Sequence, residues 1–192
     1  YLRSKAWGEI AEARGEAGDD MGALALIEKI PNAYEKSLRY GYVAKALARR
    51  GDRETAIRIV TAGLKNCGEE EQDFKTGNAY AHLVVALAES GDLDGAIRRL
   101  QVIPEGFSDR EFATVDVAVC LARKGEISRS VALMKPIAEQ NRDWKVRDVV
   151  DKAVKEADPA AFRPLIELIQ DPYLRGITQE SIAKEQLRRG KT

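Results

Sequence analysis

The residue types that carry most enzyme chemistry are scarce in this chain. His82 is the only histidine, and Cys67 and Cys120 are the only cysteines. A zinc site needs several His, Cys or carboxylate ligands, and a serine-type nucleophile needs a histidine base beside it. One histidine with two cysteines far apart in sequence fits neither arrangement. We therefore expect His82 to be a surface or groove side chain, Cys120 to be a buried thiol and Cys67 to lie exposed beside a loop.

Motifs that bind phosphate or activate a serine are absent as well. The sequence contains no Gly-x-x-x-x-Gly-Lys-Ser/Thr, no Gly-x-Gly-x-x-Gly and no Gly-x-Ser-x-Gly. Asp92-Leu93-Asp94-Gly95 is like part of a calcium loop, but it lacks the third acidic position and the distal glutamate. We expect no cofactor, no metal and no enzyme activity. The one enzyme hypothesis left open would use His82 and Asp116.

Composition narrows the classes of partner. The 192 residues include 31 basic and 31 acidic side chains, so the formal net charge is zero, which argues against nucleic acid and anionic membranes. The longest apolar runs, such as Leu83–Ala88, are far shorter than the ~18 residues of a membrane span, so we expect no insertion. The compartment stays open, with the cytoplasm slightly favoured. Because the chain begins at Tyr1 instead of Met, we expect a processed or trimmed piece.

A recurring hexapeptide predicts how the chain is organised. Gly51-Asp52-Arg53-Glu54-Thr55-Ala56 has close copies that begin at Gly18 and Gly91 and a worn copy that begins at Gly125, at intervals of 33, 40 and 34 residues. Glycine tolerates the left-handed conformation that ends a helix, and the aspartate after it can cap the next helix. We interpret each copy as the bend between two antiparallel helices. The polar run 67–73 accounts for the one long interval, as an insertion between two units.

Helical spacing of apolar residues fills the stretches between the bends, and no alternating pattern predicts a strand. The first predicted helix, 3–17, has Trp7, Ile10 and Ala11 on one face. Pro136 should bend or strain the helix that contains it, and Asp158-Pro159 should begin a further helix. The last helix, about 173–189, is polar, as the end of a repeat array requires. We expect an all-α fold of about eleven helices.

These residues resemble a tetratricopeptide repeat array, a family of helix pairs of about 34 residues with Gly-Asp-x-x-x-Ala at the bend. Trp7, Tyr40 and Tyr80 each precede a bend by 11 residues, where the family also has a large aromatic residue. The match is good in the first four units and poor after residue 140, which leaves room for a related helical repeat. The resemblance implies one domain, 1–192, wound as a right-handed α-solenoid. The expected units are 3–32, 33–68, 69–107, 108–141 and 142–171, with a capping helix at 172–190.

The resemblance also implies that the first helices of the pairs line a concave face that binds a peptide or a partner helix. Only Lys45 and Asn78 have chemistry suited to the carboxylate clamp of some family members, so that activity is not carried over. The residues expected on the groove floor are Tyr42, Lys45, Arg49, His82, Val85, Glu89, Asp116, Val119 and Arg123. An apolar strip with mixed charges would suit a segment with one or two hydrophobic anchors. The alternative is that Val85 and Val119 only pack against neighbouring repeats.

The leading functional hypothesis is a non-enzymatic scaffold that binds a peptide or protein partner on this face. The second is a self-assembly module of a larger protein, in which units stack end to end. The small helical enzyme is the weakest of the three.

Overall fold

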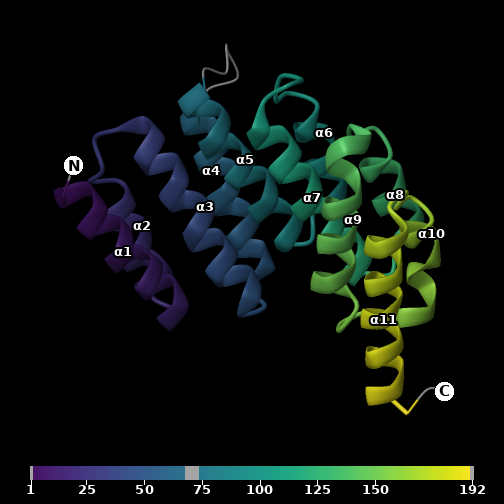
Figure 1. Cartoon of the computed structure of the whole chain (residues 1–192). Coiled ribbons are helices and arrows are strands. Elements are labelled where there is room, and N and C mark those ends of the chain that lie inside the picture. Colours follow the sequence, from purple (N-terminus) through teal and green to yellow (C-terminus); the bar gives the residue numbers. More distant parts are fainter. Residues whose placement is uncertain (1, 68–73, 191–192) are drawn as a thin grey trace. The chain divides into compact units, whose positions relative to one another are not determined.

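The computed structural model describes residues 2–67 and 74–190, and every regular element in these residues is helical. The chain divides into two compact units, 1–113 and 114–192, and the helix α7 spans the boundary (Figure 1). The described residues contain eleven α-helices and one 3-10 turn. The expected all-α fold and the helix number are therefore confirmed for the described part of the chain.

Helices of the first unit pack against the next helix in the sequence or the next but one. They are α1 (Leu2–Ala17), α2 (Asp20–Ile27), α3 (Ala33–Arg49), α4 (Arg53–Cys67), α5 (Phe74–Glu89), α6 (Leu93–Leu100) and the start of α7 (Ser108–Arg123). Helices of the second unit also contact near neighbours in sequence. After the end of α7 they are α8 (Ile127–Met134), α9 (Glu139–Ala153), the 3-10 turn η1 (Pro159–Phe162), α10 (Arg163–Ile166) and α11 (Pro172–Arg188).

The predicted bends share one hydrogen-bond pattern. Gly51 has a φ of 92°, its N–H donates to Ala48 O at 3.0 Å, and the Asp52 N–H donates to Leu47 O at 3.0 Å. This pair of bonds satisfies the last carbonyls of the helix and requires a left-handed residue, which glycine supplies without strain. The same two bonds and a positive φ recur at Gly18, Gly91 and Gly125. The interpretation of the hexapeptide as a helix end is confirmed.

The aspartates of the bends begin the following helices as expected. The Asp52 carboxylate accepts the Thr55 N–H at 3.2 Å. Asp19 and Asp92 accept from the residue three positions on, at 2.9 and 2.8 Å. Such a cap satisfies one of the donors that the first turn of a helix leaves unpaired. Glu126, in the worn copy, makes no cap of this kind.

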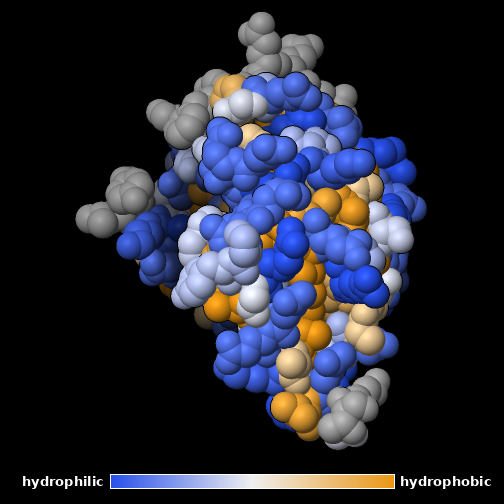
Figure 2. Space-filling view, turned by 45° about the vertical axis from the view of Figure 1, so that its right-hand side comes forward, coloured by the Kyte–Doolittle hydropathy of each residue, from blue (hydrophilic) through white to orange (hydrophobic). Residues whose placement is uncertain are grey.

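Buried side chains follow the predicted faces of most helices. In the first unit α5 is buried along nearly its whole second half, from Ala79 to Ala88 with His82 as the half-exposed exception. The core of the second unit includes Val146, Val149, Phe162 and Leu165, each fully buried. Few large hydrophobic side chains remain exposed, and the face seen in Figure 2 is mostly hydrophilic with narrow hydrophobic strips.

The first helix differs from the prediction. Ile10 is 48% exposed, so it does not share the buried face of Ala11. The side of α1 that packs inward is instead a stripe of small residues at helical spacing, Ser4, Gly8, Ala11 and Gly15. Small residues let the backbones of neighbouring helices approach closely, and Val43 of α3 lies against Gly15. The large apolar residue was therefore a poor guide to the packed face.

Proline ends helices here instead of bending them. α8 stops at Met134, so Pro136 lies outside the helix that it was expected to strain. Lys135, before the proline, keeps helical angles (φ −58°, ψ −39°), but Pro136 has no N–H to continue the helical hydrogen bonds, which explains the end of the helix. Asp158 does accept the Ala160 N–H, at 3.2 Å, but the element that follows is the 3-10 turn η1 and the four-residue α10. Pro164 stands at the start of α10, where it removes a backbone donor.

The remaining expectations concern the two cysteines, the insertion and the domain assignment. Cys67, at the last position of α4, is half-buried instead of exposed, and burial raises the pKa of its thiol. Cys120 is buried as expected. Residues 68–73 of the proposed insertion lie outside the described residues. The single-domain assignment for 1–192 stays a prediction.

Candidate functional site

A row of hydrogen-bonded side chains joins the first helices α3, α5 and α7 near their N-terminal ends. The Tyr34 hydroxyl donates to Asn78 Oδ1 at 3.2 Å, and Asn78 Nδ2 donates to Asp109 Oδ1 at 2.8 Å. Burial raises the pKa of Tyr34, and the charges of Glu35, Tyr42 and Asp109 raise it further. We call Tyr34, Asn78 and Asp109 the polar row. It fixes the register of three helices on one face of the first unit.

Aromatic rings form a second row on the same three helices. The His82 ring lies 5.5 Å from the Tyr42 ring and 5.4 Å from the Phe112 ring, measured between centroids, in edge-on and tilted geometries. The Arg39 guanidinium lies 5.5 Å from the Tyr42 ring. Tilted rings at such distances attract each other, and a cation over a ring adds to that attraction. We call Tyr42, His82 and Phe112 the aromatic row.

The aromatic row presents apolar surface to solvent. Phe112 is 42% exposed, while Tyr42 and His82 are each partly covered. His82 lies four residues beyond Asn78 on α5, and Phe112 three residues beyond Asp109 on α7, so the two rows run side by side. Hydroxyl, amide, carboxylate, imidazole and phenyl groups are thus gathered on one surface. It can offer stacking contacts and hydrogen bonds to a ligand.

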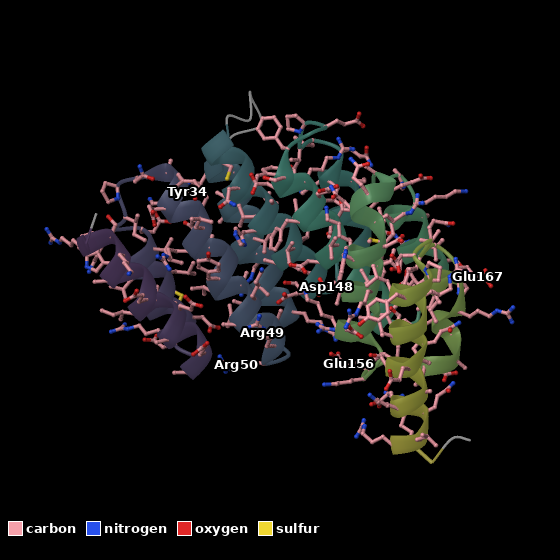
Figure 3. All side chains as sticks on the ribbon, in the orientation of Figure 1. Tyr34, Arg49, Arg50, Asp148, Glu156 and Glu167 are labelled. Atoms are coloured by element: carbon pink, nitrogen blue, oxygen red, sulfur yellow. The ribbon has the colours of Figure 1, made fainter. Side chains whose placement is uncertain are left out.

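Charged groups lie further along the same helices. Arg49, at the end of α3 opposite Tyr34 (Figure 3), points its guanidinium to within 3.8 Å of the Glu89 carboxylate on α5. The Arg49 side chain is 70% exposed, whereas that of Glu89 is 20% exposed. Lys45 lies between the aromatic row and Arg49 on α3 and is half-buried. The structure thus brings five of the predicted groove residues of the first unit, Tyr42, Lys45, Arg49, His82 and Glu89, onto adjacent helices.

The charged residues predicted for the groove in the second unit, Asp116 and Arg123, form ion pairs. Asp116 on α7 pairs with Lys152 on α9 at 3.4 Å, and Arg123 pairs with Glu156 at 3.0 Å. The pKa of Lys152 is raised because the carboxylates of Asp148 and Asp116 outweigh its partial burial. The enzyme hypothesis that uses His82 and Asp116 stays a prediction.

The two predicted valines do not reach the surface. Val85 is 1% exposed and Val119 is 3% exposed. Their burial agrees with the alternative in which they pack against neighbouring helices. Sequence reasoning missed Tyr34, Asp109 and Phe112, although each lies on the predicted helices within two turns of a groove residue. The sequence feature that could have found them is the continuation of the predicted helix faces toward the N-termini, at spacings of three and four residues.

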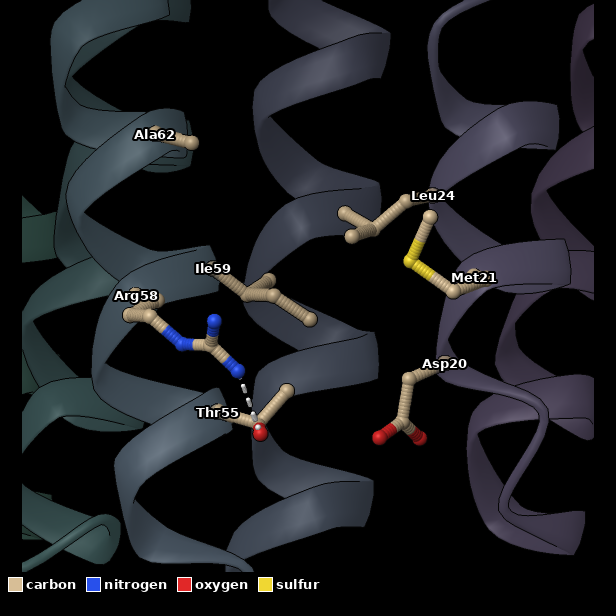
Figure 4. A pocket seen from close by; sticks show the side chains of 7 residues that line it. All are labelled: Asp20, Met21, Leu24, Thr55, Arg58, Ile59 and Ala62. Carbon is tan, nitrogen blue, oxygen red and sulfur yellow. Dashed lines mark hydrogen bonds between the residues drawn. The ribbon is translucent and has the colours of Figure 1, made fainter.

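A pocket also lies between α2 and α4, on helices that the prediction did not consider (Figure 4). Its volume is about 310 Å³. Four apolar side chains and three polar ones line it: Met21, Leu24, Ile59 and Ala62, with Asp20, Thr55 and Arg58.

Two features are absent from the residues that the structure describes. In them, no three His, Cys, Asp or Glu side chains come together as a metal site would require. Within the same residues, every helix is too short or too polar to cross a bilayer. Comparison of the chain with models of protein families, with curated proteins and with solved structures finds no match.

Proposed function

We propose that the chain is a non-enzymatic scaffold that binds an extended segment of a partner protein on the first helices of its first unit. The observation that carries this proposal is the aromatic row. Rings from the three helices α3, α5 and α7 lie next to one another, and the last of them, Phe112, leaves two fifths of its surface open to solvent. Aromatic side chains are among the residues that contribute most to binding energy in protein interfaces.

The flanking groups define what such a segment would carry. Apolar or aromatic anchors would stack on the row, and an acidic group would meet Lys45 and Arg49 on α3. The polar row, already hydrogen-bonded within the protein, supplies a rigid edge and few free donors. Preorganised side chains lose little entropy when a ligand binds, which favours affinity.

The arrangement that we propose is a right-handed array of antiparallel helix pairs similar to tetratricopeptide repeats. Support comes from the four glycine bends with one hydrogen-bond pattern and from the packing of helices with near neighbours in sequence. In such an array the first helices share a face, and the two rows lie on that face in α3, α5 and α7. Asp116, Val119 and Arg123 belong to the second unit, and their part in binding stays a prediction.

The test is selection of 12-residue peptides from a random display library against the whole chain. We expect the selected peptides to lose about ten-fold or more in affinity for Phe112→Ala, and acidic ones to lose affinity for Lys45→Glu. Val102→Ala is the matched control, since Val102 is 45% exposed and lies outside the rows. Peptides that bind all three variants as they bind the unmodified chain would contradict the proposal.

A further inference from the structure

The pocket between α2 and α4 is an apolar groove, and the exposed side chain of Met21 stands on its rim. Leu24, Ile59 and Ala62 form its inner wall, and Met21 stands at the edge with 78% of its surface exposed (Figure 4). A volume of about 310 Å³ is at the lower end of the range for ligand sites, about 300–1,000 Å³. Its lining comes from the first five residues of α2 and from residues 55–62 of α4, so the groove lies beside the N-terminal parts of both helices. The groove and the Met21 side chain are thus parts of one surface.

Two opposite charges, Asp20 and Arg58, line the two sides of this groove. The Asp20 side chain is 27% exposed, and its buried Oδ1 forms an ion pair with Arg50 Nη1 at 3.8 Å. The Arg58 guanidinium donates to Thr55 Oγ1 at 2.9 Å and forms no ion pair with a described residue. Asp20 stands on α2 and Arg58 on α4, near the N-terminal ends of both helices. The surface therefore has an acid on one side, a base on the other and apolar side chains between them.

A surface with this pattern is complementary to itself. A two-fold axis parallel to the helices, placed beside α2, lays the α2 of each copy into the groove of the other. Each Met21 then enters the apolar wall formed by Leu24, Ile59 and Ala62. The same operation carries the Asp20 of each copy toward the Arg58 of the other, so an acid meets a base at two places in the contact. Such two-fold contacts are the commonest kind between identical chains.

We propose that the α2–α4 groove is a self-association face, occupied by α2 of a second copy of this chain. The charge pattern is self-complementary, and this favours a second copy over a foreign helix. A foreign helix would need only one charge and one apolar anchor to bind. The face lies on α2 and α4, whereas the proposed binding rows lie on α3, α5 and α7, so this inference does not rest on the proposed function. The contact is small, so it is transient and concentration-dependent.

Sedimentation velocity of the whole chain, from about 1 to about 500 µM, tests this proposal by the rise in mass from one chain of 21.2 kDa toward twice that value. We expect Met21→Asp to weaken association at least about ten-fold, because it places a charge against the apolar wall. Asp20→Arg and Arg58→Asp should each weaken it, because each creates like charges across the two-fold axis. The double exchange Asp20→Arg with Arg58→Asp should restore association, since the ion pairs form again with reversed polarity.

Controls separate the groove from general charge effects and from misfolding. Glu54→Arg makes the same charge change as Asp20→Arg at an exposed site of α4 outside the pocket, and it should leave association unchanged. Thermal unfolding of every variant checks that the fold is intact. A chain that is monomeric at all concentrations overturns the proposal. A dimer whose association is the same in the single variants and in the double exchange overturns it as well. If a Met21→Cys variant stays monomeric but forms a crosslink with a helix of another protein, the groove belongs to that partner, and the proposal is also overturned.

Discussion

Arg189 Nε donates a hydrogen bond of 2.7 Å to Glu185 Oε1, one helical turn earlier on α11. The same guanidinium reaches the end of α9, where it donates to Ala157 O at 2.9 Å, to Val154 O at 3.1 Å and to Lys155 O. It thus satisfies carbonyls of the turn that follows α9. The pair Glu185–Arg189 therefore fastens α11 to α9 inside the second unit.

The first prediction follows from the charge of Glu185. Hydrogen bonds from Arg188 and Arg189 lower the pKa of this carboxyl to about 2, from an ordinary value of 4.5. Because the folded pKa is the lower one, the stabilisation is present above about pH 4.5 and is lost as the pH falls toward 2. Glu185→Gln should therefore destabilise the second unit at pH 7 and differ little from the unmodified chain near pH 2. Urea unfolding at several pH values measures the difference.

Glu180→Gln is the control for this experiment, because Glu180 pairs with Lys184 on the exposed side of the same helix. Exposed pairs of this kind contribute little to stability. A Glu185 effect that is no larger than the Glu180 effect, or that persists unchanged near pH 2, would contradict the role given to the Glu185–Arg189 pair.

The second prediction concerns the bend at Gly51. Its φ of 92° is costly for a residue with a side chain, although no atom lies within 4 Å of where a Cβ would stand. Gly51→Ala should destabilise the first unit by about 1–2 kcal/mol, through backbone strain alone. Gly77→Ala is a matched control, because Gly77 lies inside α5 with room for a methyl group, and it should be neutral or stabilising. Equal urea midpoints for the two variants would show that the bend does not need glycine.

The third prediction tests the contact between Tyr40 and Glu28. The Tyr40 hydroxyl, on a ring that is only 4% exposed, donates to the Glu28 carboxylate. This hydrogen bond is the main cause that lowers the pKa of Glu28, and the bond from Lys36 adds to it. Burial is the main cause that raises the pKa of Tyr40, and the same bond to Glu28 adds to it. Tyr40→Phe should cost about 0.5–1.5 kcal/mol at pH 7.

The sign of the pH effect for Tyr40 follows from its raised pKa. Its stabilising contribution is complete below about pH 10, the ordinary tyrosine value, and is lost as the pH rises further. Absorbance titration should show a tyrosine that ionises at unusually high pH, and Tyr40→Phe should remove that step. If Tyr40→Phe removes an early step instead, the buried contact is wrong.

The bends and the candidate site differ in how far the sequence predicts them. Gly51 and Asp52 act locally: one residue needs a positive φ and the next needs a carboxylate, so residue type alone indicates the structure. The row of Tyr34, Asn78 and Asp109 depends on how three helices are aligned along their axes. The repeat interval does not set that alignment, because the intervals vary and residues 67–73 interrupt one of them.

Packing between helices explains the other differences. Ile10 is more hydrophobic than Gly8 or Gly15, yet the small residues form the packed face of α1 because they allow close approach. Hydrophobicity alone favoured the wrong side. The α2–α4 groove likewise depends on how two helices pack side by side, which the hydrophobic pattern of either helix alone does not set.

The last prediction concerns the polar row itself. Asp109 is 8% exposed, its Oδ1 accepts from Asn78, and its Oδ2 accepts no hydrogen bond. Asn78→Ala should therefore destabilise the first unit by about 1–3 kcal/mol, because it leaves a buried carboxylate without its donor. Asp109→Asn in the same background should recover part of that loss, since it removes the buried charge. A double-mutant cycle, measured by urea unfolding, yields the coupling between the two residues. Gln101→Ala, at an exposed site of the same unit, is the control and should change little. Additive effects of Asn78→Ala and Asp109→Asn would mean that the two side chains do not interact, and the register of α5 against α7 would then need another explanation.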